Sequence, residues 1–344
     1  MTPRPQTTTP RALSRLAAST TLLGALVLAG CGTQDALVGL HAAPVEQTAA
    51  APLDTEGATA VAARLLAAKD AAAAGAAKDA KAAAAARAEV LTGDALTLAN
   101  AEAGRAVPSG ATTDLAPEPT PKIVAQSQGR QWPRAILAST LDEATNIQWL
   151  HVMTSAKPDE PFHIAASVPM FGGAELPALG EQLAGAPLLK TTDKNGLPVS
   201  PADAVKAYAA AVAQPKGKAT DLVVTDDQFA TGLKSAAATQ AKTLGALGAL
   251  SQVHEPRLDD AITFRLADGG SVTFALLKRT DTFTPKPGAK ELTLPAEYAK
   301  LVGTSKVTKS LVLNNLEPIV MVMPKTGQAK VIGASDLLVS GRAR

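Results

Sequence analysis

Residues 262–276 have the pattern of an antiparallel β-hairpin, which rules out an all-helical fold. An apolar side chain occupies every second position on both sides of the turn sequence Asp268-Gly269-Gly270: Ile262, Phe264, Leu266, then Val272, Phe274 and Leu276. Alternate residues of a strand point to the same face of a sheet, and Asp-Gly or Gly-Gly pairs favour tight turns between antiparallel strands. We therefore expect one buried face on this hairpin and further strands beside it.

Period-two patterns recur along the chain. They predict strands at 122–127, 133–140, 148–154 and 162–170, and a final strand at 309–323 that returns through Val331, Ile332 and Leu338. Pro318 has no backbone N–H, so it predicts a bend or an edge position in the final pair. Asp259-Asp260 predicts a turn before the strand that begins at Ile262.

Helices are expected before the first set of strands. Residues 56–87 are mostly Ala with spaced charged residues, and Ala is the best helix former, so we expect one long helix capped by Asp54 or Thr55. Few of its apolar side chains are larger than Ala, which favours a stalk or peripheral helix over a lipid-binding one. A second helix is expected to follow Gly93.

The C-terminal half repeats this order. Ser200 is expected to cap a helix that begins at Pro201. Asp226-Asp227 is expected to cap a second helix, over 226–247, which precedes the remaining strands. The patterns together predict an α+β fold in which N-terminal helices are followed by an antiparallel meander sheet, repeated twice. We place the two helix-plus-sheet units at 56–190 and 199–344, with an internal duplication as the hypothesis.

The first thirty residues are typical of a secretory signal peptide. Arg4, Arg11 and Arg15 form a positive segment, and an apolar run over 16–28 follows without an acidic residue. This run is shorter than the ~20 apolar residues that a spanning helix needs. The segment ends at Leu28-Ala29-Gly30-Cys31, the pattern of a bacterial lipobox, in which Leu28, Ala29 and Gly30 direct cleavage before Cys31 and the thiol receives lipid.

Lipid on Cys31 would determine the location of the protein. Each buried methylene contributes about 0.8 kcal/mol, so two or three acyl chains give stable anchoring. We expect a flexible tether over 31–55 and a body on the extracytoplasmic face of the cell membrane. Cleavage removes three arginines and no acid, so the formal charge falls from +2 to −1. This charge argues against nucleic acid as a partner, and a single Cys excludes a disulfide framework.

Several short motifs carry a family resemblance. They are, in chain order, Leu91-Thr92-Gly93-Asp94-Ala95-Leu96, Trp132-Pro133-Arg134, Leu150-His151-Val152-Met153, Asp268-Gly269-Gly270-Ser271-Val272 and Lys330-Val331-Ile332-Gly333-Ala334-Ser335. Over about 55–342, the chain resembles an uncharacterised domain of secreted actinobacterial lipoproteins. The resemblance implies location and domain content but no activity. The order of helices and strands is also similar to nuclear-transport-factor-like and cystatin-like folds, which implies no function.

Common catalytic motifs are absent from the sequence, which has no Gly-x-Ser-x-Gly, His-Glu-x-x-His, Gly-x-Gly-x-x-Gly or Walker loop. We expect His151 opposite Ala166 and His163 opposite Thr154, on opposite faces of one hairpin, so neither a metal site nor a cofactor is expected. Trp132, Arg134 and His151 are the candidate pocket residues, because Trp and Arg can stack as a cation–π pair. The alternative is a Trp that anchors the start of a strand beside an extended Arg.

Three functions remain open from the sequence. The first is a non-catalytic lipoprotein that binds a ligand or scaffolds an envelope assembly, with an envelope protein as partner. The second is a carrier for a small apolar ligand, and the third is an enzyme with a pocket on the concave sheet. A wide apolar cavity favours the carrier, whereas converging His or Asp side chains favour the enzyme.

Overall fold

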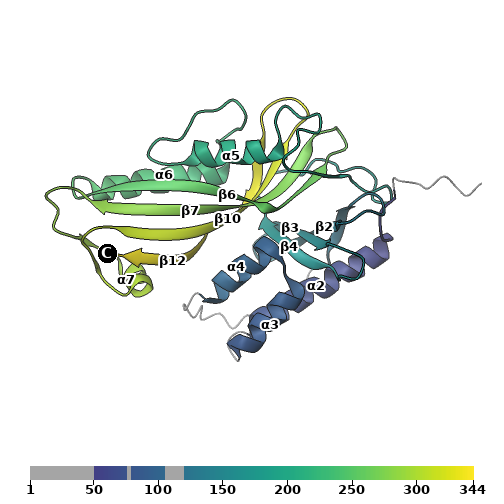
Figure 1. The fold of residues 1–344 in the computed structure, drawn as a ribbon, viewed down its shortest axis with the longest axis horizontal. Helices are drawn as coiled ribbons and strands as arrows, with labels where there is room; N and C mark the ends of the chain where they lie inside the picture. The colour runs from purple at the N-terminus through teal and green to yellow at the C-terminus, as the bar shows by residue number, and fades with distance from the viewer. Residues whose placement is uncertain (1–49, 76–78, 105–119) are drawn as a thin grey trace, which may run out of the picture. The chain divides into compact units, whose positions relative to one another are not determined.

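The computed structural model describes residues 50–75, 79–104 and 120–344, all of which belong to the unit Gln47–Arg344. The predicted α+β class is confirmed, because helices precede antiparallel sheets in both parts of the chain (Figure 1). The signal peptide, the lipobox with Cys31, and the tether as far as residue 49 lie outside the described residues. Within the described residues, no helix is both long and apolar enough to cross a membrane.

The first sheet is a meander of four antiparallel strands in the order β1-β2-β3-β4. Its strands confirm the predictions closely: β1 (Lys122–Gln126), β2 (Arg134–Asp142), β3 (Ile147–Ser155) and β4 (His163–Pro169). A β-bulge between Val152 and Met153 shifts the β3–β4 register by one residue, so His151 lies opposite Ser167 and not opposite Ala166. His163 lies opposite Thr154, as predicted.

The Ala-rich segment forms two helices, and the prediction of one helix over 56–87 was wrong. The helices are α2 (Thr55–Gly75) and α3 (Ala80–Val90), followed by α4 (Gly93–Gly104). Asp54 caps α2, since its Oδ1 accepts a hydrogen bond from the Gly57 N–H at 2.7 Å. Asp79 caps α3 by accepting from the backbone N–H groups of Lys81 and Ala82. Glycine is unfavourable in a helix and Asp favours an N-cap, so Gly75 and Asp79 divide the segment.

The Ala-rich helices pack on the first sheet, so they are not a free stalk. Ala58 and Ala62 are fully buried, and Leu65 and Leu66 are nearly so. They share one hydrophobic cluster with sheet residues that include Ile136, Met153 and Ile164. Alanine buries little area per residue, but its small side chain lets a helix approach a sheet closely. The composition of the segment alone did not predict this packing.

The second sheet contains the predicted hairpin. Its order is β11-β10-β7-β6-β5, and β12 also pairs with β10. The strands are β5 (Leu188–Leu189), β6 (Gly248–Arg265), β7 (Ser271–Pro285), β10 (Leu311–Met323), β11 (Lys330–Ala334) and β12 (Leu337–Ala343). Helices α5 (Pro201–Val212) and α6 (Gln228–Leu244) lie along one face of this sheet (Figure 1). Ser200 and Asp227 cap these helices, as expected. A small pair, β8 (Leu292–Thr293) and β9 (Lys306–Val307), flanks α7 (Ala296–Val302).

Two details of the second sheet differ from the sequence predictions. Asp259-Asp260 is not a turn, because β6 continues through it with a register shift between Arg257 and Ile262. Pro318 lies inside the central strand β10, opposite Leu276 of β7. On the other side of β10, the pairing with β12 ends at Leu316 and the pairing with β11 begins at Ile319. The missing N–H of Pro318 therefore lies where the partner strand changes.

The two sheets share a hydrophobic core. One cluster contains Leu137 and Val152 of the first sheet together with Phe264 and Val322 of the second. The Phe171 N–H donates to the Ile332 carbonyl at 2.9 Å beside it. A Cβ on Gly333 would lie 2.5 Å from the Pro169 carbonyl oxygen, so this close approach requires glycine. The helix-plus-sheet units are therefore packed into one body, and their duplication stays a hypothesis.

Candidate functional site

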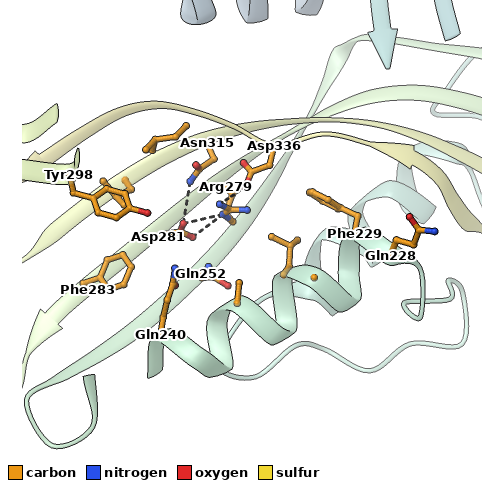
Figure 2. A pocket seen from close by; sticks show the side chains of 15 residues that line it. Gln228, Phe229, Gln240, Gln252, Arg279, Asp281, Phe283, Tyr298, Asn315 and Asp336 are labelled. Carbon is orange, nitrogen blue, oxygen red and sulfur yellow. Dashed lines mark hydrogen bonds and ion pairs between the residues drawn. The ribbon is translucent and has the colours of Figure 1, made fainter. Parts of the chain in front are cut away.

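A cavity of about 490 Å³ lies between α6 and the outer half of the second sheet (Figure 2). The residues that carry its chemistry come from three strands, one helix and the segment between β11 and β12: Gln240, Gln252, Arg279, Asp281, Asn315 and Asp336. Phe229 of α6, Phe283 of β7 and Tyr298 of α7 add aromatic side chains to the lining. The exposed residues Gly232 and Ala236 are the small members of the lining on α6.

Strand register brings the polar residues of the cavity together. His254 and Asn315 both lie opposite Arg279, and Gln252 lies opposite Asp281 two residues further along β7. Side chains two positions apart on a strand point to the same face, so Arg279 and Asp281 share the face that α6 covers. Residues from positions 252 to 315 thereby meet at one place.

Arg279 is the centre of a buried ion-pair network. Its Nε lies 3.0 Å from Asp281 Oδ1, its Nη1 lies 2.6 Å from Glu317 Oε1, and its Nη2 lies 2.9 Å from Asp336 Oδ2. Figure 2 shows the guanidinium beside Asp281 and Asp336. Each of its three nitrogens therefore has a carboxylate partner.

Further side chains hold two of these carboxylates, Glu317 and Asp281, in place. Glu317 is fully buried, and its Oε2 lies 2.8 Å from the His254 Nδ1. The Asn315 Nδ2 donates to Asp281 Oδ2 at 3.2 Å. Glu317 and Asp281 are therefore each held by a second side chain besides Arg279.

Negative charge exceeds positive charge in this network. Three carboxylates face one guanidinium, so the sum of their charges is negative when the carboxylates are ionised. Burial raises the pKa of Asp281 and of Asp336, against the opposing attraction of Arg279. Burial opposes the charge of Arg279, but Glu317, Asp336 and Asp281 together raise the pKa of its guanidinium.

Two buried amide oxygens of the cavity have no hydrogen-bond partner among the described residues: Gln240 Oε1 and Gln252 Oε1. Gln252 is only 3% exposed. Buried polar atoms are nearly always satisfied in folded proteins, so unpartnered ones that line a cavity indicate a place for a ligand or water. Both atoms are hydrogen-bond acceptors.

The pocket residues proposed from the sequence do not line this cavity. The Arg134 guanidinium lies 4.3 Å from the centre of the Trp132 ring, so these two residues form the cation–π stack that we considered. His151 lies elsewhere on the first sheet, opposite Ala138, whereas Arg134 lies opposite Ser155. The structure therefore brings Trp132 and Arg134 together but separates His151 from them.

His151 is a buried structural residue. Its Nε2 lies 2.9 Å from Thr140 Oγ1, and its Nδ1 lies 2.9 Å from Ser167 Oγ. Burial, with a smaller effect from Lys69, lowers the pKa of His151 to about 3. Its ring is therefore neutral at physiological pH. Among the described residues, no group of three or more His, Cys, Asp or Glu side chains is arranged to hold a metal ion.

Sequence reasoning missed the Arg279 network. One signal was present in the sequence. Asn315 and Glu317 lie on the same face of β10 as Leu311 and Leu313, a face that was expected to be apolar. Partners of Arg279 lie 38 positions away at Glu317 and further away at Asp336, so only the strand register connects them.

A family model described as a domain of unknown function (DUF8094) matches residues 121–341, a range that holds the first sheet, nearly all of the second sheet and the whole Arg279 network. Helices α2 to α4 precede this range. No curated protein and no solved structure matches the chain.

Proposed function

The chain belongs to the family described as domain of unknown function DUF8094, whose description names no activity, and we propose a function from its own residues. In this proposal, the protein is a lipoprotein anchored at Cys31 on the extracytoplasmic face of the cell membrane. Its second sheet and α6 bind a small polar ligand without converting it. The resemblance to actinobacterial lipoproteins agrees with this location.

The anchor is supported by the order of features at the N-terminus. A positive segment, a short apolar run and Leu28-Ala29-Gly30-Cys31 follow one another, and Cys31 is the only cysteine of the chain. A second electrostatic anchor is not required, since the mature chain has a formal charge of only −1 once three arginines have been removed.

One observation carries the binding proposal: the buried amide oxygen of Gln252 lines a 490 Å³ cavity and has no partner in the described part of the chain. A pocket of roughly 300–1,000 Å³ with a few fixed polar groups is the usual form of a small-molecule site. An apolar ligand would leave Gln240 Oε1 and Gln252 Oε1 unsatisfied, at a cost of about 1–3 kcal/mol per group. The polar lining therefore favours a polar ligand over the apolar one considered above.

Binding is favoured over catalysis by the contacts of the carboxylates. Asp281 and Asp336 are the acids in the cavity lining, and their raised pKa is the observation that supports an enzyme as the second candidate. Both, however, are ion-paired to Arg279. A carboxylate that must leave an ion pair to accept or give a proton is a poor general acid or base.

The anchor is tested by intact-mass analysis of protein purified from native envelopes in detergent. The proposal predicts a chain that begins at Cys31 and carries a mass increment equal to two or three acyl chains. A Cys31→Ser variant should lose this increment and leave the membrane fraction. An unmodified thiol, or a chain that still carries residues 1–30, would contradict the proposal.

The binding site is tested by extracting small molecules from the same purified protein and identifying them by mass spectrometry. A Gly232→Trp variant places a large ring at the mouth of the cavity, because a Cβ at Gly232 meets open space. Ser235→Trp is the matched control, since Ser235 is exposed on the same helix but does not line the cavity. A compound that is present in wild type and in Ser235→Trp but depleted in Gly232→Trp supports the proposal. Equal extracts from all three proteins refute it.

A further inference from the structure

We propose that the cavity beneath α6 binds a small organic cation, an ammonium or guanidinium group on a compact and partly aromatic or aliphatic body. This inference rests on the proposed function, because it assumes that the cavity holds a ligand. It assigns the chemical class of that ligand, which neither the family description nor the sequence supplies.

The contacts of Arg279 disfavour an anionic ligand. Its Nε, Nη1 and Nη2 each lie within 3.0 Å of a carboxylate oxygen, so the guanidinium with its five N–H donors already faces three carboxylates. Among the described residues, no other Lys or Arg lines the cavity. An anion entering the cavity would therefore meet Asp281 and Asp336 and would share one guanidinium with three carboxylates.

The charge of the network favours a cation. Glu317, Asp281 and Asp336 carry three negative charges in the ionised state, against the single guanidinium of Arg279. Asp281 and Glu317 are buried, so their charge is weakly screened by solvent and its effect on a charged ligand is stronger than at the surface. Burial raises the pKa of Asp281 and of Asp336, and the charge of Glu317 raises it further, against the opposing effect of Arg279.

The free acceptors supply hydrogen bonds for such a group. Gln240 Oε1 on α6 and Gln252 Oε1 on β6 line the cavity and have no hydrogen-bond donor among the described residues. An ammonium group has three N–H donors and no acceptor, and a guanidinium has only donors as well. The type of the two free atoms therefore matches a cationic nitrogen.

The aromatic side chains suit the same ligand. Tyr298, Phe283 and Phe229 line the cavity around the polar network (Figure 2). Aromatic faces attract organic cations by roughly 0.5–2 kcal/mol and also cover an apolar ligand body. A bare metal ion uses neither property, and it would have to displace the Arg279 guanidinium from the three carboxylates that the guanidinium already holds.

The test uses isothermal titration of the full, detergent-solubilised protein with matched probes. Three cations are used: tyramine, cadaverine and agmatine. Each is paired with a neutral analogue in which methyl or hydroxyl groups replace every cationic group, two of them in cadaverine and agmatine, and 4-hydroxyphenylacetate is the anionic probe. Because hydrogen bonds to charged groups contribute about 1.5–3 kcal/mol, at least one cation should bind roughly tenfold or more tightly than its neutral analogue.

Three variants identify the site of this binding. Asp281→Asn should lower the affinity for the cation by about tenfold or more, since it removes one charge from the cavity wall. Tyr298→Leu keeps apolar bulk but loses the aromatic face. It should lower the affinity for the cation by about threefold to tenfold while preserving the fold. Glu297→Gln is the matched control: Glu297 is exposed on the same short helix and does not line the cavity, so its loss should leave affinity unchanged.

The outcomes separate this inference from the proposed function. No binding by any of the three cations, or equal binding by the neutral analogues, overturns the assignment of a cation. Cation binding that is equally weakened by Glu297→Gln and Asp281→Asn also overturns it, because the attraction would then be a general surface effect. In each case, the extraction experiment with Gly232→Trp still decides separately whether the cavity holds a ligand.

Discussion

Replacing Asp94 by Asn should stabilise the protein at neutral pH and leave it unchanged at acidic pH. Asp94 lies in the first turn of α4, where its side chain is buried and its Oδ1 has no hydrogen-bond partner. The nearest cation, Arg257 Nη2, is 3.9 Å away. Asp260 is close by, since a Cβ on Gly93 would lie 2.9 Å from the Asp260 Cγ.

The magnitude follows from the pKa of Asp94. Burial first, and then the charge of Asp260, raise this pKa from 3.8 to about 6, against a smaller opposing effect of Arg257. One pKa unit corresponds to about 1.36 kcal/mol, so the ionised carboxylate costs the native state roughly 3 kcal/mol. Between pH 3.8 and about 6, the native state keeps a proton that the unfolded chain has released. The free energy of unfolding therefore falls as pH rises through this window.

The assay is urea unfolding of wild type and Asp94→Asn at intervals between pH 4 and 8. An amide has the shape of a protonated carboxyl, so the two proteins should be equally stable near pH 4. Above pH 6 the variant should be more stable by up to roughly 3 kcal/mol. The exposed Asp221→Asn serves as a control and should keep the wild-type pH dependence. A difference between wild type and Asp94→Asn that does not change with pH would refute the reasoning.

Three further predictions concern Arg279, Gly232 and His151. Arg279→Leu leaves the buried carboxylates of Asp281 and Glu317 without their cation and should lower the free energy of unfolding at pH 7 by about 3–5 kcal/mol in urea, whereas the exposed Lys278→Leu should have little effect; similar losses for both would contradict the network. Gly232→Ala adds a methyl group where nothing lies within 4 Å. The free energy of unfolding should therefore rise by about 0.5–1 kcal/mol, because glycine is less favourable than alanine inside a helix. A loss of stability in thermal unfolding would show that the helix needs glycine there. The ring of His151 should show no titration by NMR between pH 5 and 8, because its pKa is about 3; a midpoint near the ordinary 6.5 would contradict its burial.

Local patterns predicted most strands and several helix caps. The hairpin over 262–276 follows directly from alternation and a glycine turn, and Phe264 pairs with Val272 as that pattern requires. The caps at Ser200 and Asp227 were predictable because a short polar side chain before an apolar helical repeat has few other roles. These features depend on residues that are near one another in the chain.

Features that depend on distant partners could not be predicted. Pro318 was expected at a bend or an edge, but it lies inside β10. The neighbouring strand changes there from β12 to β11, so no hydrogen bond from a Pro318 N–H is required. Arg279, Glu317 and Asp336 form their network only through strand register, which no short motif encodes. The Ala-rich helices were misjudged for a related reason, since their burial depends on a sheet that begins at Lys122.

The most direct measurement is a high-resolution crystal structure of the protein purified from its native envelope. The account predicts electron density for a small molecule in the cavity beneath α6, in contact with Gln252 and Asp281. Ordered water alone around these two side chains, or α6 packed directly onto the sheet with no cavity, would contradict it.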